Sequence, residues 1–335
     1  MSDGINQLNH GCDITESGIE ALEFPRCEAK RGPRLAVMAS ASSIWVAGEA
    51  LIDLVPIAGE RVAIVGGGPA NTAKALARLG LTPSFIGGIS SDDFGKAIEK
   101  ELQDVDLSHA LRSDLPTALA EVTLDKSGSA SYKFKLDATA TFDFHAFWLP
   151  KGIPSILHIG TLATLVEPGA SELFKWAKDL NSVMVFDPNV RSSVLSDRKK
   201  YREIFERWAS ISKIVKMSQE DLDFLGFSNG SQIIGMGPEL VVVTKGSEGI
   251  DGFTLEGIVS VPGVRVDVVD TVGAGDTVGA IIVEGVIRYG LEDLKNGSLF
   301  GVLTRATKAA AITCSRAGAN PPTQEEIKGF KEEKR

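Results

Sequence analysis

The chain contains 335 residues, of which 43% are hydrophobic and 24% are charged, so it can bury a core in one large domain or two smaller ones. Its net charge of −9 argues against nucleic acid or an anionic membrane surface as its main partner. The three cysteines (Cys12, Cys27 and Cys314) are too few and too far apart for a disulfide framework or a zinc site, and this usage is typical of the reducing cytoplasm.

The first 42 residues show little hydrophobic periodicity and mix acidic with basic side chains. They lack the basic start and apolar stretch of a signal peptide, and no part of the chain approaches the roughly 18 uninterrupted apolar residues of a transmembrane helix. We therefore expect residues 1–42 to be a flexible N-terminal extension, with Met38 as an alternative start, and residues 43–330 to form the folded domain.

From Ile44 onward, short strand-like runs alternate with amphipathic stretches. The alternation predicts an α/β protein with a central, mostly parallel β-sheet flanked by helices, in which ligands bind at the carboxyl ends of the strands. The predicted strands are 44–47, 83–86, 155–159, 183–186, 213–217 and 240–243, and the clearest helices are 69–80, 171–180 and 198–209.

Residues 117–136 depart from this alternation. They form two segments of alternating polarity around "DKSG" (125–128), which is typical of a β-hairpin. In the second segment Tyr132, Phe134 and Leu136 share one face. The pattern fits a small lid over a cleft, and it fits a solvent-facing excursion equally well.

The stretch "DTVGAGDTVGA" (270–280) places three glycines and two aspartates directly before an apolar run, which we expect to form a buried helix that Gly290 ends. The first amides of a helix have no partner within it, and glycines let such amides approach an anion closely. Asp276 at this position is interpreted as a helix N-cap, as a general base beside a bound phosphate, or as both.

Other phosphate-binding motifs are absent or weak. The "GK" pair at Gly95 is followed by alanine rather than by the Ser or Thr of a P-loop. The run "GGGPAN" (66–71) does not have the GxGxxG spacing of a dinucleotide-binding turn, so the sequence does not favour a dinucleotide-dependent oxidoreductase.

Two motifs in combination are more specific. The run "VDTVGAGDT" (269–277) resembles the C-terminal signature of the ribokinase, or PfkB, family of carbohydrate kinases, and "GGGPANTAKALARLG" (66–80) resembles its N-terminal signature. The resemblance implies a ribokinase-like fold with a small β-sheet lid, formed here from about 53–65 and 117–136. Within the family, the runs most similar to fructokinases are "GEALIDL" (48–54), "DPNVR" (187–191) and "VKMSQEDLDFL" (215–225).

The resemblance assigns catalytic roles to the helix start. Asp276 matches the family's base, which removes the proton of the sugar hydroxyl as its oxygen attacks the γ-phosphate of ATP. The amides of Gly273, Ala274, Gly275 and Asp276 match an anion hole that stabilises charge on the transferring group.

The resemblance also implies a set of sugar-binding positions. Carboxylate and amide groups suit sugar hydroxyls because their hydrogen bonds are directional. The residues alone leave other interpretations open. Asp53 could be a strand-end acid in water, Asn71 could cap the helix that begins near Pro69, and Arg191 could belong to a surface ion pair. The implied positions are Asp53, Gly67, Gly68, Asn71, Asn189 and Arg191.

Two further runs match nucleotide contacts. The run "VTKGSEG" (243–249) resembles the family's TxGxxG turn, although a plain strand-to-turn connection also explains its glycines. The run "CSRAGANPP" (314–322) matches the loop beneath the adenine, where Cys314 is expected to pack as a small apolar residue. The implied nucleotide-binding positions are Lys216, Ser218, Thr244, Gly246, Gly249, Cys314 and Gly318.

Cation positions follow from the same resemblance. Asp270 and the carbonyl of Val272 match a loop that binds a monovalent cation, often K⁺. The family's NxxE motif, which orients Mg²⁺ through water, appears here as "SQED" (218–221). Because aspartate is one methylene shorter than glutamate, either Glu220 or Asp221 is the expected acid on the magnesium side.

The implied activity is phosphoryl transfer from ATP, with Mg²⁺, to a primary hydroxyl of a sugar, with D-fructose to fructose 6-phosphate as the leading reaction. Ribose and 2-keto-3-deoxygluconate are alternative substrates. A sugar- or nucleotide-binding regulator without turnover is a second hypothesis, against which the intact Asp276 argues. Aromatic residues expected on the outer face of the lid suggest a homodimer through it.

Overall fold

The computed structural model describes residues 43–57, 59–124 and 130–331 of the chain. The predicted extension (1–42) and the predicted "DKSG" turn (125–128) lie outside the described residues. Among the helices that are described, none is long and apolar enough to cross a membrane.

A large sheet forms the centre of the described chain, and eight described strands take part in it in the order β14-β13-β12-β11-β10-β9-β1-β4. The strands from β12 to β4 pair in parallel, and β13 and β14 add an antiparallel edge. This confirms the predicted mostly parallel sheet. The strands are β1 (Ile44–Ala47), β4 (Pro83–Ile86), β9 (Ile156–Gly160), β10 (Val183–Asp187), β11 (Ile214–Ser218), β12 (Leu240–Thr244), β13 (Ile250–Thr254) and β14 (Gly257–Val261).

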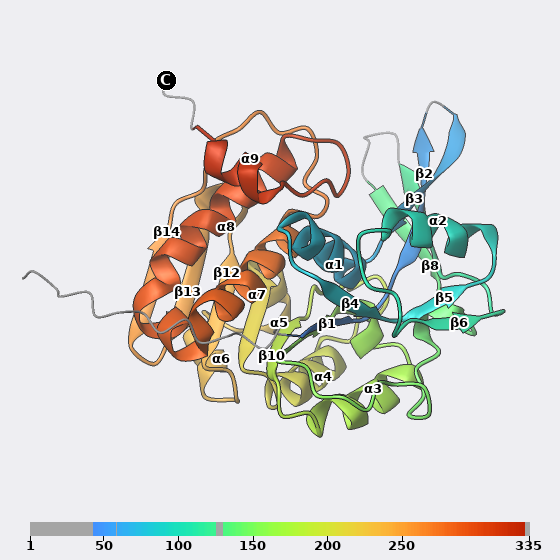
Figure 1. Cartoon of the computed structure of the whole chain (residues 1–335), viewed down its shortest axis with the longest axis horizontal. Helices are drawn as coiled ribbons and strands as arrows, with labels where there is room; N and C mark the ends of the chain where they lie inside the picture. The colour runs from blue at the N-terminus through green and yellow to red at the C-terminus, as the bar shows by residue number, and fades with distance from the viewer. Residues whose placement is uncertain (1–42, 58, 125–129, 332–335) are drawn as a thin grey trace, which may run out of the picture. The chain divides into compact units, whose positions relative to one another are not determined.

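Helices cover both faces of the large sheet, as the apolar strand sequences require. On β12, Leu240 and Val242 belong to the core beneath α1, α7 and α8, whereas Val241 and Val243 belong to the core beneath α3, α4 and α5. Figure 1 shows α7 and α8 together on the first face and α3 and α4 on the second. The helices are α1 (Gly68–Arg78), α2 (Asp93–Glu101), α3 (Gly169–Lys178), α4 (Arg198–Ala209), α5 (Gln219–Leu225), α6 (Ser231–Ile234), α7 (Ala274–Asp293), α8 (Leu299–Cys314) and α9 (Gln324–Gly329).

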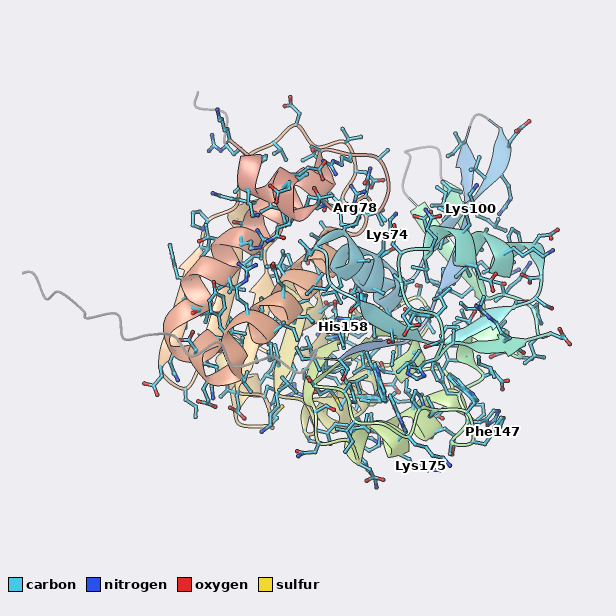
Figure 2. The ribbon with its side chains drawn as sticks, viewed as in Figure 1. Lys74, Arg78, Lys100, Phe147, His158 and Lys175 are labelled. Carbon is cyan, nitrogen blue, oxygen red and sulfur yellow. The ribbon has the colours of Figure 1, made fainter. Side chains whose placement is uncertain are left out.

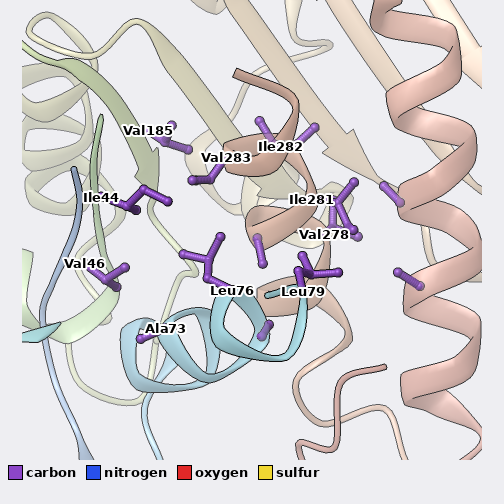
Figure 3. Close-up of a cluster of buried hydrophobic side chains, with 14 of the residues drawn as sticks. Ile44, Val46, Ala73, Leu76, Leu79, Val185, Val278, Ile281, Ile282 and Val283 are labelled. Carbon is purple, nitrogen blue, oxygen red and sulfur yellow. The ribbon is translucent and has the colours of Figure 1, made fainter. Parts of the chain in front are cut away.

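The first core fixes the two helices that matter most for the site. Leu76 of α1 and Ile281 of α7 pack together with Val46 of β1 and Val185 of β10, all of them buried (Figure 3). Because α1 and α7 share this core, their N-termini are held in a constant relation to each other and to the carboxyl ends of the strands.

A small sheet stands beside the large one (Figure 1) and contains the predicted hairpin. Its described strands have the order β3-β2-β7-β8, with β2 and β7 parallel and the outer pairs antiparallel. The strands are β2 (Leu51–Ile57), β3 (Glu60–Gly66), β7 (Leu119–Leu124) and β8 (Ala130–Lys135), and a separate parallel pair is formed by β5 (Gly88–Ser90) and β6 (Leu111–Ser113).

The exposed side chains of the small sheet differ from the prediction, because the strand register places Phe134 and Ile64 on the face that carries Asp53. Phe134 on β8 is partly buried and packs against the second core, so it does not provide the expected aromatic surface. The large apolar side chains that the described part of this sheet exposes are the aliphatic ones of Ile57, Val62 and Ile64.

Candidate active site

Segments far apart in the sequence meet around Gly68, the first residue of α1. A Cβ atom at Gly68 would lie 2.8 Å from Thr161 Oγ1, 3.1 Å from Asn189 Nδ2 and 3.3 Å from Asp276 Oδ1. Thr161 and Asn189 lie just beyond the ends of β9 and β10, and Asp276 lies in the first turn of α7. A glycine here leaves three polar atoms around one small space at the carboxyl ends of parallel strands, where sheets of this kind bind ligands.

Asp276 combines burial with a defined hydrogen bond. Its residue is 7% exposed, and Asn71 Nδ2 donates to Asp276 Oδ2 at 2.8 Å. Burial raises the pKa of Asp276 to about 6, although the nearby Lys216 ammonium partly opposes the rise. A carboxylate of this pKa is ionised at neutral pH and basic enough to act as a general base. Because Asn71 bonds to Asp276 and Gly67 is the N-cap of α1, the capping role considered for Asn71 is wrong.

The start of α7 corrects one sequence prediction. Gly273 is the N-cap residue, with φ of 78°, and Asp276 is the third residue of the helix rather than its N-cap. The Asp276 carboxylate bonds to Asn71 instead of to the helix amides. In the described part of the chain, the amides of Gly275 and Asp276 donate to no protein acceptor, and the ladder begins with the amide of Thr277. Two free amides and the positive end of a long helix can therefore bind an anion.

Behind this helix end lies a buried ion pair. Lys216 Nζ on β11 donates to Asp187 Oδ2 at 2.8 Å, and both side chains are buried. A Cβ atom at Gly275 would lie 2.9 Å from Lys216 Nζ, so the ammonium stands directly against the first turn of α7. Lys216 was expected to be a nucleotide-binding residue. In the structure its ammonium is paired with Asp187.

A buried histidine continues this polar row on the next strand. His158 on β9 is 1% exposed, and neither ring nitrogen has a hydrogen-bond partner within the described chain. Burial lowers the pKa of His158 to about 3, so the ring is neutral. A Cβ atom at Gly279 would lie 3.4 Å from His158 Nε2, so Gly275 and Gly279, one turn apart, give α7 room for Lys216 and His158. Figure 2 shows His158 in the interior of the molecule.

Arg191 and Asn189 form one unit after β10. Arg191 donates through Nη1 to Asn189 Oδ1 at 2.7 Å and to the Asn189 carbonyl at 3.2 Å, and its amide donates to the Tyr201 hydroxyl at 3.0 Å. Asn189 has a left-handed backbone, with φ of 37°. The surface ion pair considered for Arg191 is absent from the described residues, because the guanidinium bonds to neutral oxygens.

Asp53 lies on β2 opposite Ile64 of β3, and its carboxylate reaches the position of Gly66 just before α1. Burial raises the pKa of Asp53 to about 6, and the charge of Arg191 partly opposes the rise. A Cβ atom at Gly66 would collide with the Asp53 carboxylate, and one at Gly67 would collide with the Glu49 carbonyl. The glycines therefore let strand β3 and the start of α1 pass close to Asp53, which is half-buried rather than a fully hydrated strand-end acid.

The expected magnesium-side acids differ in their surroundings. Ser218 and Asp221 form a capping box at the start of α5, and Asp221 Oδ1 also accepts from the Val190 amide at 2.8 Å. Asp221 is buried, whereas Glu220 is exposed. No group of three or more His, Cys, Asp or Glu side chains within the described ranges could hold a metal ion by itself. The carboxylate oxygens at this helix suit a hydrated Mg²⁺ that keeps most of its ligands from water and phosphate.

The positions expected near the nucleotide lie in two loops. Thr244 ends β12, and Gly246 and Gly249 turn the chain into β13 with positive φ angles of 55° and 113°. Cys314 ends α8, and its carbonyl accepts from the amides of Val269 and Asp270. Burial raises the pKa of the Cys314 thiol, which disfavours the thiolate and agrees with a packing role.

The predicted cation loop is closely tied to the end of α8. Asp270 Oδ1 accepts from the Val272 amide at 3.0 Å, and Asp270 Oδ2 accepts from the Gly318 amide at 2.9 Å. Each carboxylate oxygen keeps a lone pair beyond this bond, and oxygen donors of this kind suit a hard cation.

Helix α1 contacts both Asp276 and the loop that follows α8. Besides Asn71, it carries Lys74, which donates to the Ala319 carbonyl at 3.0 Å, and Arg78, whose Nε donates to the Pro321 carbonyl at 3.3 Å. Ala319 in turn packs against Gly273, where a Cβ atom would lie 2.7 Å from Ala319 Cβ. Figure 2 shows Lys74 and Arg78 on the side of α1 that faces this loop.

Sequence reasoning missed two residues of the site. Glu49 follows β1 and is 1% exposed, and its carboxylate accepts from the amides of Leu162 and Ala163. Burial raises the pKa of Glu49 to about 7, and these amide donors oppose the rise. Thr161 follows β9 and faces Gly68. The signal for both was their position at the carboxyl end of a predicted strand, which only the fold makes specific.

Comparison with known proteins identifies a family and several relatives. The family model described as pfkB family carbohydrate kinase matches residues 41–326. A fructokinase of Rhizobium leguminosarum bv. trifolii is 36% identical over 251 residues, covering 70% of this chain and 76% of that protein.

Solved structures extend the likeness to the fold. A fructokinase from Xylella fastidiosa with bound ATP superposes with a TM-score of 0.79 at 26% identity, covering 86% of this chain and 97% of that one. A fructokinase from Vibrio cholerae O395, bound to fructose, ADP and calcium ion, has a TM-score of 0.77 at 28% identity, covering 87% and 99%.

Proposed function

Since the chain belongs to the pfkB family of carbohydrate kinases, we propose that it transfers the γ-phosphoryl group of ATP to a primary hydroxyl of D-fructose, giving fructose 6-phosphate and ADP. The solved fructokinases with bound ATP and with bound fructose and ADP support this choice of substrates. The observation that carries the proposal is the meeting of Asp276 with an anion-binding helix end beside the space at Gly68.

The proposed base is Asp276. Its carboxylate takes the proton of the sugar hydroxyl while that oxygen forms a bond to the γ-phosphorus and the bond to the β-phosphate oxygen breaks. Asn71 holds one carboxylate oxygen through its 2.8 Å hydrogen bond and leaves the other, Oδ1, directed toward the space at Gly68. We propose that the amides of Gly273, Gly275 and Asp276 form the anion hole for the transferring group, whereas the Ala274 amide, which was expected there too, donates to the Thr271 carbonyl at 3.3 Å.

The proposed sugar contacts are Asp53, Gly67, Gly68, Asn71, Asn189 and Arg191. Asp53 and Asn71 supply acceptor and donor groups for hydroxyls, and the glycines let the sugar approach the backbone. Arg191 acts mainly by holding Asn189, because its Nη1 is engaged with Asn189 oxygens at 2.7 Å and 3.2 Å.

For the nucleotide we propose the loops that contain Thr244, Gly246, Gly249, Cys314 and Gly318. Lys216, whose ammonium lies against Gly275, and Ser218, at the start of α5, are the other proposed nucleotide-binding positions. Mg²⁺ bound to the phosphates would neutralise their charge, with Glu220 or Asp221 holding its water shell. Asp270 and the Val272 carbonyl would hold K⁺.

We also propose that residues 43–330 are the kinase domain, with the small sheet acting as a lid over the sugar. The cysteine usage supports a cytoplasmic location, and the exposed aliphatic side chains of the small sheet support a homodimer through it.

The test is an ADP-release assay at fixed Mg²⁺ and K⁺ with fructose, ribose and 2-keto-3-deoxygluconate. We expect the highest kcat/KM with fructose and a product identified as the 6-phosphate by ³¹P NMR. Preference for another sugar would contradict fructose as the substrate. A protein that binds ATP but releases no sugar-dependent ADP would contradict the kinase proposal and favour the regulator.

A further inference from the structure

Thr161, which faces Gly68 in the candidate site, has a strained backbone. Thr161 is a β-branched residue with φ of 57°, a left-handed conformation that such residues rarely adopt. It is 3% exposed and begins a short 3₁₀ turn (Thr161–Thr164) directly after β9. Strained residues of this kind persist only where the surrounding structure holds them, and they gather at binding and catalytic sites.

The hydroxyl of Thr161 is directed at the candidate site and is not used by the protein. Its Oγ1 would be the nearest atom to a Cβ at Gly68, closer than Asn189 Nδ2 or Asp276 Oδ1. No hydrogen bond among the described residues involves Thr161 Oγ1, whereas the Thr161 carbonyl accepts from Thr164 Oγ1 at 2.7 Å. A hydroxyl without a protein partner that faces a base, on a residue that is otherwise buried, is suited to a ligand hydroxyl.

Glu49 holds the turn that carries Thr161. Its two carboxylate oxygens accept from the next two amides along the chain, those of Leu162 at 3.4 Å and Ala163 at 3.1 Å. Glu49 is itself fixed, because Gly48 packs against Pro69 of α1 and the Glu49 carbonyl packs against Gly67. The carboxylate therefore connects the start of α1 with the strained turn after β9.

We propose that Thr161 is a substrate contact that hydrogen-bonds a sugar hydroxyl beside Asp276, and that Glu49 is the positioning residue that holds Thr161 in its strained conformation. This inference rests on the proposed function in that a sugar occupies the space at Gly68. It adds one side chain from the turn after β9 to contacts that otherwise come from the small sheet, α1, α7 and the segment after β10.

Three substitutions at Thr161 separate contact from structure. Thr161→Val keeps the shape and loses the hydroxyl, so the sugar KM should rise roughly 3–10-fold with an unchanged KM for ATP. Thr161→Ser keeps the hydroxyl and should stay near wild type. Thr161→Gly relieves the strain, so it should raise the melting temperature by roughly 1–3 °C while it also raises the sugar KM. Thr304→Val, on the outer part of α8, is the matched control and should change neither quantity.

Glu49→Gln tests the positioning role. The amide keeps one acceptor and turns an NH₂ group toward a backbone donor, so the sugar KM should rise while the KM for ATP stays constant. In the Thr161→Val background the same change should have little further effect on the sugar KM, because both act through one hydroxyl. Equal effects of Glu49→Gln in both backgrounds would overturn the positioning role, and an unchanged sugar KM in Thr161→Val would overturn the contact.

Calorimetric sugar binding keeps this test independent of turnover. If wild type prefers another sugar, the fructose proposal fails and the variants are compared with the preferred sugar. If wild type binds sugar without turnover, the kinase proposal fails and the dissociation constants decide the role of Thr161. If no sugar of the panel binds at millimolar concentration, the Thr161 contact is overturned together with the proposed function.

Discussion

Asp276 is a buried carboxylate, and as the proposed base it must stay ionised to accept a proton, although burial disfavours the ionised form. We expect Asp276→Asn to lower kcat by roughly 10²-fold or more, because general-base catalysis is lost, while the Asn71 bond and the sugar site persist. Coupled ADP release gives kcat, and calorimetry gives the sugar dissociation constant. A near-normal kcat in this variant would show that the base is another residue.

The pH dependence of the reaction follows from the same carboxylate. The pKa of Asp276 is raised to about 6, and only the ionised form accepts a proton, so kcat/KM of wild type should fall as the pH drops through about 6. The residual rate of Asp276→Asn should lack this fall. Asp53 and Glu49, whose pKa values burial raises to about 6 and about 7, are present in both proteins, so a fall that persists in the variant would assign the titration to one of these two carboxyl groups.

The raised pKa of Asp276 is also a statement about stability. Its folded pKa of about 6 lies above the unfolded value of 3.8, so the native state holds the extra proton between these values and loses stability as the pH rises through that window. Above pH 6 the ionised carboxylate costs roughly 3 kcal/mol, which Asp276→Asn removes. Urea unfolding should therefore show a more stable variant at pH 7 and a much smaller gain at pH 4. Asp104→Asn, at an exposed position, is the control, and an equal gain there would contradict the argument.

At the scale of elements, α7 packs onto α8 through a glycine whose contacts can be tested. A Cβ atom at Gly285 would lie 3.0 Å and 3.2 Å from the two γ-carbons of Val302 on α8, whereas at Gly301 of α8 it would meet nothing within 4 Å. Alanine is favoured over glycine inside a helix by roughly 1 kcal/mol, so Gly301→Ala should stabilise the protein by up to that amount. Gly285→Ala should instead destabilise it, because Val302 must move. The midpoints of urea unfolding compare the stability of the two variants. Higher stability in both would show that Val302 can move away from the added methyl group without cost.

Strands and helices whose limits depend on neighbouring residues were predicted from the sequence pattern. The apolar runs at 44–47 and 240–243 became β1 and β12, and Pro69 and Gly80 bounded α1 much as expected. The start of α7 was misplaced because Gly273 takes the N-cap with a positive φ, which glycine allows without a side-chain cap. The residue pattern alone did not distinguish an N-cap at Gly273 from an N-cap at Asp276.

The candidate site was predictable only in part, for a reason of distance along the chain. Asn71 and Asp276 are 205 residues apart, and a family resemblance brought them together where no local pattern could. Thr161 and Glu49 had no motif of their own, because their roles depend on which strands end side by side. The pairing of Lys216 with Asp187 likewise depends on the register of β10 and β11.

At the scale of the whole molecule, β3 is an edge strand of the small sheet and is exposed on both faces along most of its length. It presents Val62 and Ile64, each 38% exposed, beside Ile57 at 48% on β2. An apolar edge strand in water invites pairing with another chain, and a second copy of the same sheet would cover it symmetrically. We therefore expect a homodimer formed through this sheet.

Sedimentation velocity at assay concentration measures the expected dimer directly. Val62→Lys, opposite the apolar Val55 on β2, places a charge without an opposite-charge partner in the covered face and should shift the protein to monomer, since a buried unpaired charge is costly. Leu255→Lys, at a turn position 86% exposed between β13 and β14, makes the same chemical change away from the small sheet and should leave the dimer intact. A monomeric wild type would refute the dimer, and dissociation by Leu255→Lys alone would move the interface to the antiparallel edge of the large sheet.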